Sequence, residues 1–533
     1  MNRHELQDLG GGTISGLLAQ RARYAPANAA LVFNAHTYSF ADLDRMASIV
    51  AAGLITLGLR PGDVAATFMG NRPEHLFTSY GGSRAGVIRV PVNTGYKGAL
   101  LAHVLAHSEA KLLVMEAALA DALASLDKLP SSLRIIVCVD GMPAGVPPGD
   151  VTLLSWEEML AAAGPATAFP VTLPHDVGGI GFTSGTTGRS KGVVSPQFQA
   201  LMMAKETAGA LGFSARDRVY TCMPLFHGMA SVTTALSAMY AGAATILSQH
   251  FSVSRFWDEV RDAQATQFSC LGSMLHMLLS APPSARDRDH RIERVFAAPA
   301  PPEVLYRFES RFGVHIVEGY GQTEIKNILY NPLLGRRIGS MGKPTPSSIL
   351  EIHDENGQAL GPGEIGELVY RPKVANIMMK GYLKEPEKTL AGMQDLWWHT
   401  GDMASMDGDG FFYFFDRKTD SLRRRGENIS SQELEGLLAA FQGVREAAAV
   451  ATPSEVGEDE VLVVLEVAEP ATFDLAALHE HCQAVMPKFM VPRYYRIISG
   501  FPRTPTGKVQ KAALRADGVT TDTWDARPAR VVA

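Results

Sequence analysis

Short apolar runs alternate with helical patterns along the first part of the chain. Apolar runs at 64–69, 87–92 and 112–115 are separated by segments at 73–85 and 100–106 whose apolar residues follow helical spacing. Such alternation predicts strand, helix and strand units around a parallel sheet. The same rhythm returns downstream at 219–223, 244–247, 267–271, 294–298 and 316–318. The pattern therefore predicts repeated α/β layers.

The pattern changes beyond about residue 345, where short alternating segments such as 367–370 are separated by glycines. Gly357, Gly361, Gly363 and Gly366 mark the turns between these segments. Alternating segments joined by glycine-containing turns are typical of antiparallel strands. We therefore expect a small antiparallel β region here.

A second change comes at the charged stretch 416–420, which follows the aromatic run 411–415. Beyond it, Ser430 and Glu433 have the spacing of a helix capping box ahead of an apolar helical face. Further strands and a helix are predicted at 447–450, 461–467 and 475–485. This part of the chain is expected to form a compact α+β unit of its own.

The predicted fold class is α/β with two unequal domains. Residues 1–415 form a large N-terminal body of layered α/β subdomains plus the small β region. Residues 416–420 form a hinge, and residues 421–533 form the small α+β C-terminal domain.

Composition narrows the functional classes. The chain has 533 residues, 46% of them hydrophobic and 20% charged, which suits a folded protein of several subdomains. Its formal net charge is −6, and the only dense basic run is the short cluster 423–425, so nucleic acid is not expected as a partner.

The four cysteines lie far apart and lack the paired spacing of zinc sites, which indicates reduced core thiols. Since the sequence shows neither a secretory signal nor a long apolar stretch, we expect a cytoplasmic protein without integral membrane association.

The segment most specific for chemistry follows the apolar run 177–182. It reads Thr183-Ser184-Gly185-Thr186-Thr187-Gly188-Arg189-Ser190-Lys191-Gly192. Glycines let the backbone N–H groups approach phosphate oxygens, and the hydroxyls and the lysine add donors and charge. The gap from Gly185 to Gly188 is too short for a Walker-type loop, and Lys191 comes too late for one. The alternative is a flexible linker, which the preceding strand and the lysine disfavour.

This segment resembles the phosphate loop of the adenylate-forming superfamily, which comprises acyl-CoA synthetases, nonribosomal adenylation domains and luciferases. One departure is Ser190, where the family most often has proline. Further family strings follow in order at 320–324, 363–368, 381–382, 400–402, 416–417, 426–428 and 502–511. Each string alone is weak evidence, but their joint order along most of the chain is strong evidence.

The resemblance implies an ATP-dependent enzyme with Mg²⁺ and with coenzyme A as co-substrate. The implied catalytic residues are Lys508, Lys191, Thr187, Glu324 and His227, with Glu324 as the metal ligand. The implied nucleotide-binding residues are Thr183, Ser184, Gly185, Thr186, Thr187, Gly188, Lys191, Ala298, Pro299, Tyr320, Gly321, Thr323, Asp402, Arg417 and Lys508.

Several of these roles have a physical rationale and a plainer alternative. Tyr320 offers a ring for adenine stacking, and Glu324 offers a carboxylate oxygen suited to Mg²⁺, whereas a core tyrosine and a solvated loop charge are the alternatives. Asp402 has two acceptor oxygens for both ribose hydroxyls, although Thr-Gly-Asp also suits a plain turn. Arg417 is a permanent charge that a neighbouring aspartate could pair instead.

The remaining roles concern the acyl site and domain movement. His227 resembles the family residue at the mouth of the acyl pocket, and a half-buried structural histidine is the alternative. Lys508 resembles the lysine that enters the site during adenylation, although surface lysines are the commonest kind. The resemblance implies a mobile C-terminal domain whose rotation brings first Lys508 and then segment 421–428 to the site. Thr419 stands at the hinge position, where aspartate or lysine is commoner.

The expected reaction joins a small carboxylic acid to coenzyme A through an acyl-AMP, with release of pyrophosphate. Loading of a carrier protein, a luciferase-like oxygenation and an ATP-binding regulator without catalysis are the alternatives, and a homodimer is left open. Small residues around the pocket predict a medium or bulky acyl group, and the string 423–430 is similar to carnitine and crotonobetaine CoA ligases. Lys326, just past Glu324, is interpreted as a surface lysine, and contact with a polar substrate is the alternative.

Overall fold

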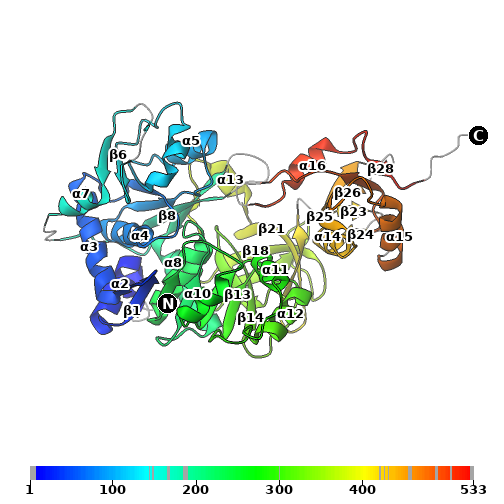
Figure 1. Cartoon of the computed structure of the whole chain (residues 1–533), viewed down its shortest axis with the longest axis horizontal. Helices are drawn as coiled ribbons and strands as arrows, with labels where there is room; N and C mark the ends of the chain where they lie inside the picture. The colour runs from blue at the N-terminus through cyan, green and yellow to red at the C-terminus, as the bar shows by residue number, and fades with distance from the viewer. Residues whose placement is uncertain are drawn as a thin grey trace, which may run out of the picture. The chain divides into compact units, whose positions relative to one another are not determined.

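The chain divides into two compact units, which are described separately. The computed structural model describes residues 8–142, 145–146, 149–164, 168–183, 190–298, 300–418, 422–424, 427–429, 431–453, 459–486, 490–503 and 507–527 (Figure 1). The first unit comprises Met1–Thr183, Ser190–Ile349 and Tyr370–Leu396, and the second comprises Ser184–Arg189, Leu350–Val369 and Trp397–Ala533. The predicted hinge at 416–420 stays a prediction, since residues 419–421 lie outside the described residues.

One sheet of the first unit has eight strands in the order β19-β9-β8-β4-β3-β5-β6-β7. Its strands are β3 (Val64–Phe68), β4 (Ile88–Pro91), β5 (Leu112–Met115), β6 (Ile135–Cys138), β7 (Thr152–Ser155), β8 (Val177–Thr183), β9 (Lys191–Pro196) and β19 (Gly381–Tyr382). Strands β3 to β8 are parallel wherever they pair, while β9 and β19 join antiparallel at one edge. The residues on either side of the predicted phosphate loop therefore lie near one edge of this sheet.

The second sheet of this unit has nine strands in the order β16-β15-β14-β13-β12-β10-β11-β1-β2. Its strands are β1 (Ala29–Phe33), β2 (His36–Ser39), β10 (Arg218–Thr221), β11 (Ala244–Leu247), β12 (Gln267–Cys270), β13 (Arg294–Ala297), β14 (His315–Gln322), β15 (Lys326–Tyr330) and β16 (Lys343–Pro344). The central strands are parallel, and β14 and β15 form an antiparallel hairpin. That hairpin carries the predicted adenine and metal residues.

Helices pack on both sheets and contribute to a shared apolar core. The helical segments of this unit are η1 (Gly10–Gly12), α2 (Ile14–Tyr24), α3 (Phe40–Thr56), α4 (Pro73–Ala85), α5 (Gly98–His107), η2 (Ala117–Leu119), α6 (Ala120–Ala124), α7 (Trp156–Ala161), α8 (Gln197–Leu211), η3 (Met229–Leu236), α9 (Ser237–Ala241), α10 (Phe256–Asp262), α11 (Gly272–Ser280), α12 (Pro302–Phe312) and α13 (Pro386–Ala391). Segment η3 is a π-helix. A short strand, β20 (Met393–Gln394), follows α13.

Local sequence explains where these elements begin and end. Helix α4 starts with Pro73, which suits the first helical position, and ends at Gly86 with a left-handed φ of 72°. Helix α3 has a capping box in which Ser39 and Asp42 bond each other's backbone N–H groups. Every residue of β3 and β5 is buried, as expected for parallel strands covered on both faces.

The second unit contains most of a small sheet. Strand β17 (Ser348–His353) lies beside β18 (Gly366–Pro372), which pairs with β21 (Trp397–Met406), and β22 (Phe412–Arg417) pairs antiparallel with β21. The small β region expected beyond about residue 345 is thus present.

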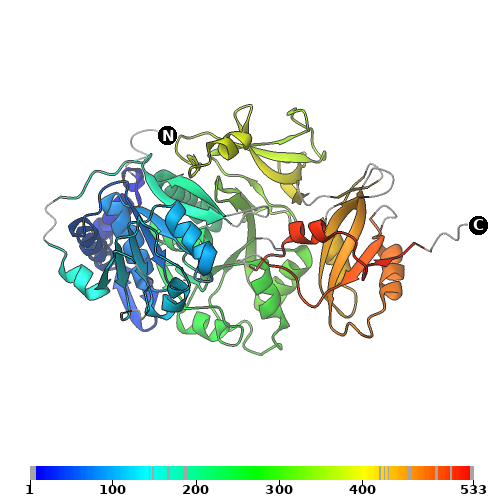
Figure 2. The same ribbon diagram turned by 90° about the horizontal axis from the view of Figure 1, so that it is seen from above.

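The rest of the second unit is an α+β arrangement. Its elements are β23 (Leu422–Arg424), β24 (Glu427–Ile429), α14 (Ser431–Ala439), β25 (Val444–Pro453), β26 (Asp459–Val467), α15 (Leu475–Val485), β27 (Tyr494–Ile497), α16 (Lys511–Asp517) and β28 (Trp524–Asp525). Strands β25 to β28 form one sheet, which appears in orange and red in Figure 2. The predicted capping residue Ser430 lies outside the described residues.

The predicted fold class is confirmed, and so is the interpretation of the cysteines. Cys138, Cys222, Cys270 and Cys482 are all free and buried. Burial raises the pKa of Cys138 to about 11, so this thiol stays protonated at neutral pH. Within the described ranges, no helix is both long and apolar enough to span a bilayer.

Candidate active site

The hairpin of β8 and β9, beside the edge strand β19, places Thr183 and Lys191 opposite each other in the ladder. Thr183 is the last residue of β8, Lys191 is the first residue of β9, and both are half-buried. The sheet therefore brings the two flanks of the predicted phosphate loop together. The predicted loop residues themselves, Ser184, Gly185, Thr186, Thr187 and Gly188, lie outside the described residues.

Helix α5 holds the backbone on both sides of this edge. The Nε2 of His103 lies 2.9 Å from the carbonyl oxygen of Ser190, and the Nε2 of His107 lies 3.0 Å from that of Leu383. The two imidazoles stack with ring centroids 5.0 Å apart. Each contact places a ring N–H on a backbone carbonyl, so α5 stabilises the strands that carry Lys191 and Tyr382.

Lys191, Tyr382 and Glu324 form a connected chain of polar contacts. The ammonium of Lys191 donates to the phenol oxygen of Tyr382 at 3.3 Å, and that phenol donates to Oε1 of Glu324 at 2.8 Å. The Lys191 Nζ also lies 4.3 Å from the centroid of the Tyr382 ring. Burial, followed by the nearby carboxylate of Glu324, raises the pKa of Tyr382, so its hydroxyl remains a donor. Lys191, predicted to act on phosphate, and Glu324, predicted to bind the metal ion, are thus joined through Tyr382.

The β14–β15 hairpin presents Tyr320, Gly321, Thr323 and Glu324. Gln322 pairs with Lys326 in the ladder, so the tip of the hairpin is short and contains Thr323 and Glu324. A Cβ on Gly321 would come within 2.3 Å of the backbone oxygen of Lys326, so the backbone here accepts only glycine. Tyr320 is half-buried and its phenol accepts a hydrogen bond from Gln322 at 3.1 Å. Thr323 and Gly321 are exposed.

Hydrogen bonds to the backbone carbonyls hold the chain in place at Glu324. The side-chain amide of Gln199 on α8 donates to the carbonyl oxygens of Thr323 and Glu324 at 3.0 and 3.3 Å. The backbone N–H of Met379 donates to the carbonyl of Glu324 at 2.7 Å. These two residues were not predicted from the sequence, because Gln199 carries no recognisable motif and Met379 acts through its backbone alone.

The surroundings of Glu324 suit a magnesium ion that is completed by phosphate oxygens. The residue is 9% exposed, and one carboxylate oxygen is already oriented by Tyr382. Mg²⁺ is commonly bound by one or two carboxylates together with substrate phosphates. Over the described residues, no cluster of three or more His, Cys, Asp or Glu side chains could hold a metal by itself. Glu324 therefore fits the predicted metal role.

His227 is exposed at the start of the π-helix η3. Its backbone carbonyl accepts from the N–H of Ser231 at 3.1 Å. The loop before it is held by Asn71, which accepts from the N–H of Leu225 at 2.8 Å and donates to the carbonyl of Met223 at 2.9 Å. The structure thus places His227 on an anchored loop and not in the half-buried position that a structural histidine would take.

The predicted adenine loop follows β13. Ala298 is half-buried and Ala300 is buried, while Pro299 lies outside the described residues. Glu318, at the entry to the hairpin, accepts hydrogen bonds from the backbone of Gly339 and Ala300. Burial outweighs these bonds and raises the pKa of Glu318 to about 7.

In the second unit, Asp402 and Arg417 face each other across β21 and β22. The Nε of Arg417 lies 3.6 Å from Oδ1 of Asp402, whose side chain is 6% exposed against 48% for the arginine. The turn before Asp402 is held by Glu367, which accepts from the Gly401 N–H at 3.0 Å and pairs with Lys418 at 2.9 Å. Although burial favours a higher pKa for Glu367, its hydrogen bonds outweigh burial and hold the pKa below its usual value.

Lys508 is exposed, on a loop that turns at Gly507 with a left-handed φ of 82°. Partial removal of its ammonium from water, followed by the positive charge of Arg417, lowers the pKa of Lys508, and Asp402 opposes the shift. Lys508 is therefore within electrostatic range of both residues. The neighbouring motif residues 504–506 lie outside the described residues.

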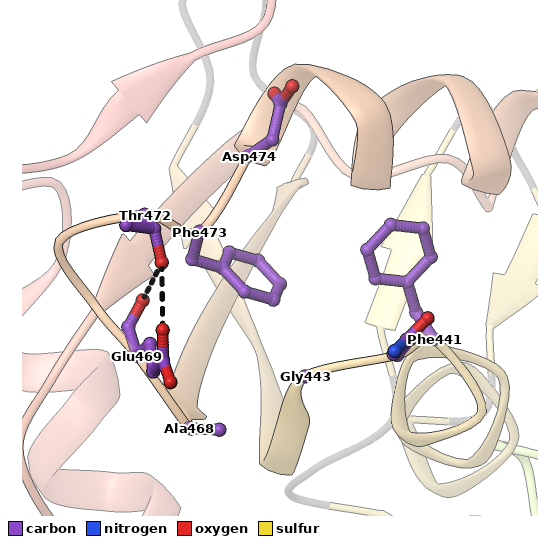
Figure 3. A pocket seen from close by; sticks show the side chains of 8 residues that line it. Phe441, Gly443, Ala468, Glu469, Thr472, Phe473 and Asp474 are labelled. Carbon is purple, nitrogen blue, oxygen red and sulfur yellow. Dashed lines mark hydrogen bonds between the residues drawn. The ribbon is translucent and has the colours of Figure 1, made fainter.

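A hollow of about 370 Å³ also lies in the second unit (Figure 3). The rings of Phe441 and Phe473 flank it with centroids 6.1 Å apart, and Thr472 donates to the Glu469 side chain at 3.3 Å. None of the residues that line it is a predicted site residue. This hollow is separate from the residues described above.

One prediction about the site is wrong. Lys326 was expected at the surface, but it is 2% exposed and its ammonium lies 2.5 Å from a carboxylate oxygen of Glu206. A lysine can be buried when every N–H of its ammonium has a partner, and a single sequence does not reveal such long-range partners.

Comparisons with known families agree with the motifs. Residues 18–383 match the model of the AMP-binding enzyme family, and residues 433–508 match that of the AMP-binding enzyme C-terminal domain.

Similar proteins include crotonobetaine/carnitine–CoA ligases. The one from Salmonella typhimurium is 31% identical over 483 residues, covering 90% of this chain and 93% of the relative. The one from Escherichia coli (strain SE11) is 32% identical over 484 residues, again covering 90% and 93%.

Solved structures share the fold. ATP-bound MatB from Rhodopseudomonas palustris is 25% identical with a TM-score of 0.81, covering 95% of this chain and 99% of that one. The o-succinylbenzoate coenzyme A synthetase of Bacillus subtilis in complex with AMP is 24% identical with a TM-score of 0.80, covering 94% and 98%. Because a family model spans most of the chain and relatives match over nearly their whole length, the protein belongs to the AMP-binding enzyme family, which confirms the resemblance.

Proposed function

We propose that this protein is an ATP-dependent acyl-CoA ligase. It activates a carboxylic acid as acyl-AMP with release of pyrophosphate and then transfers the acyl group to coenzyme A. The observation that supports this most directly is the connected chain of Lys191, Tyr382 and Glu324, beside the hairpin of β8 and β9 in the first unit. It joins a cation for phosphate to a carboxylate for Mg²⁺ in a member of the AMP-binding enzyme family.

In the first step, an oxygen of the substrate carboxylate attacks the α-phosphorus of ATP, and the bond to the bridging oxygen of pyrophosphate breaks. Both reactants are anions, so the barrier depends on positioning and on neutralising charge. Lys191 neutralises phosphate charge from the sheet edge, and Lys508 adds a second cation. Bound Mg²⁺ supplies further neutralisation of the phosphate oxygens. Glu324, oriented by Tyr382, would hold that ion.

In the second step, the sulfur of coenzyme A attacks the acyl carbonyl carbon, the thiol loses its proton, and AMP leaves. Asp402 would accept hydrogen bonds from the ribose hydroxyls, and Arg417 would contact the nucleotide. Rotation about residues 416–420 would replace Lys508 with segment 421–428. This movement is part of the proposal and follows the family resemblance.

Two observations indicate which carboxylic acids should be tested as substrates. Relatives are named for crotonobetaine and carnitine, which are small acids with a quaternary ammonium group. The residues expected around the pocket, such as those from His227 to Ser231, are mostly small and would admit a medium or bulky acid. The substrate panel should therefore include quaternary ammonium acids together with alkyl and aryl acids.

The test is an assay of the purified chain with ATP, Mg²⁺ and this panel, with and without coenzyme A. We expect acid-dependent exchange of pyrophosphate into ATP without coenzyme A, and AMP with an acyl thioester when it is present. Exchange without thioester formation, followed by acylation of a carrier protein, would favour the carrier-loading alternative. Saturable ATP binding without any AMP would favour a regulator, and oxygen uptake with acyl-AMP would favour an oxygenase.

A further inference from the structure

The hairpin tip that carries Glu324 is anchored by a buried ion pair. Lys326 is the first residue of β15 and stands opposite Gln322 in the ladder. Its backbone has a φ of 64°, a left-handed conformation that non-glycine residues seldom adopt. Its side chain is 0% exposed, and that of Glu206 on α8 is 6% exposed. Lys326, two residues after Glu324, thus combines a strained backbone with a buried charge.

The Lys326 ammonium and both carboxylate oxygens of Glu206 all have hydrogen-bond partners. The ammonium of Lys326 donates to Oε2 of Glu206 at 2.5 Å, to the hydroxyl of Thr345 at 3.1 Å and to the carbonyl of Asn327 at 3.2 Å. An ammonium has three N–H groups, so each has a partner. The other oxygen of Glu206 accepts from the backbone N–H of Ser347 at 3.1 Å. The lysine is therefore held in one position by helix α8, by the segment around Thr345 and by the backbone of its own strand.

The next residue extends the network toward the loop of His227. The amide of Asn327 donates to the phenol of Tyr330 at 3.0 Å and to the hydroxyl of Thr233 in the π-helix η3 at 3.3 Å. The Tyr330 phenol in turn bonds the hydroxyl of Thr207 on α8. Strand β15 is therefore tied both to α8 and to the helix that follows His227.

Stability alone does not account for this arrangement. Replacing a buried ion pair by apolar residues of similar volume is often neutral or stabilising, because both charges lose their hydration on burial. Ile325 in the turn and Ile328 in β15 are both 0% exposed, so apolar anchoring is available in the same hairpin. The pair instead gives the turn a defined orientation. The three N–H groups of the Lys326 ammonium are each bonded to a fixed acceptor, and these bonds hold the turn that presents Glu324 in one position and register.

We propose that Lys326 and Glu206 are a positioning pair for the hairpin tip, keeping Thr323 and Glu324 directed at the nucleotide and its metal ion. This inference rests on the proposed function for its kinetic consequence. Its structural consequence, a tip with a single conformation, holds whether or not the protein is a ligase.

The test compares the full-length protein with the variant K326M/E206L, which removes both charges at similar volume. We expect amide hydrogen exchange in the peptide 319–327 to become about tenfold faster in the absence of substrates, since the tip loses its fixed donors. We also expect the Mg²⁺ concentration for half-maximal pyrophosphate exchange to rise about tenfold, with the melting temperature kept within about 4 °C of the wild type. The variant R311M is a matched control, because it breaks the ion pair between Arg311 on α12 and Asp287.

Unchanged hydrogen exchange at 319–327 in a folded double variant would overturn the proposal, as would an equal change in R311M. If the double variant does not fold, K326R provides the test, since a guanidinium keeps the charge but not the three-donor geometry of the ammonium. An unchanged tip in K326R with wild-type Mg²⁺ dependence would then count against the positioning role. If the wild type forms no adenylate, the proposed function fails, while the exchange experiment still decides whether the pair positions the tip.

Discussion

The two groups of predicted site residues differ in how completely they are held. In the first unit, Glu324 is buried and accepts a hydrogen bond from the Tyr382 hydroxyl, which itself accepts one from Lys191. In the second unit, the buried Asp402 has exposed cations around it, Arg417 and Lys508. Buried, mutually bonded groups are preorganised before the substrate binds, whereas long exposed side chains become ordered only on binding. The first group is thus already ordered, as its proposed role with phosphate and metal requires, whereas the second includes exposed side chains that can still reorient.

The largest effect is expected from K508A, which removes the exposed cation proposed to act only during adenylation. Adenylate formation should fall about 1,000-fold while ATP affinity changes little, because transition-state charge loses its partner. Pyrophosphate exchange and thioester formation from supplied acyl-AMP should be measured separately. The variant K128A, at another exposed lysine, is the control. Exchange at a near wild-type rate in K508A would show that the assignment is wrong.

The next effect concerns Glu324 in the preorganised group. E324Q should lower pyrophosphate exchange about 100-fold at moderate Mg²⁺, and higher Mg²⁺ should partly restore it, because a neutral amide is a poorer ligand. A magnesium titration of the wild type and E324Q measures this, with E157Q as an exposed control. Superimposable titrations would exclude Glu324 as a metal ligand.

A smaller effect is expected from Y382F, which keeps the ring beside Lys191 but removes the hydroxyl that bonds Glu324. The half-saturating Mg²⁺ concentration should rise about fivefold, since one hydrogen bond orients the carboxylate. The control is Y306F, because Tyr306 is 59% exposed. If the two variants behave alike, the Tyr382 hydroxyl does not position Glu324.

The smallest effect concerns stability and pH at Glu318. Its folded-state pKa is raised from 4.5 to about 7, so the native state binds the proton more tightly than the unfolded state does. The contribution of the neutral carboxyl to stability is therefore fully present below about pH 4.5 and is lost as the pH rises through about 7. E318Q should then melt higher than the wild type at pH 8, with a smaller difference at pH 5. The same difference at both pH values would contradict the shifted pKa.

Local patterns predict the elements well where local chemistry decides them. Strand β5 has the predicted bounds because its residues form a continuous buried apolar run, and α4 has them because proline and glycine mark its ends. Motif order was enough to identify the family, since each string carries its own chemistry. These elements and motifs each depend on residues that are close together in the sequence.

Contacts between distant residues could not be predicted in the same way. The link from Lys191 through Tyr382 to Glu324 depends on how β9 and β19 pair, which no single string reveals. Lys326 was wrongly expected at the surface because its partner Glu206 lies on helix α8, far from β15 in the sequence. Burial and pairing of charges emerge only from the three-dimensional fold.

Product stoichiometry in the wild-type reaction with ATP, Mg²⁺, coenzyme A and an accepted acid is the decisive measurement of ligase activity. We expect equal amounts of AMP, pyrophosphate and acyl thioester, all dependent on the acid. Formation of ADP and orthophosphate in place of AMP and pyrophosphate, or a thioester formed without AMP, would contradict it.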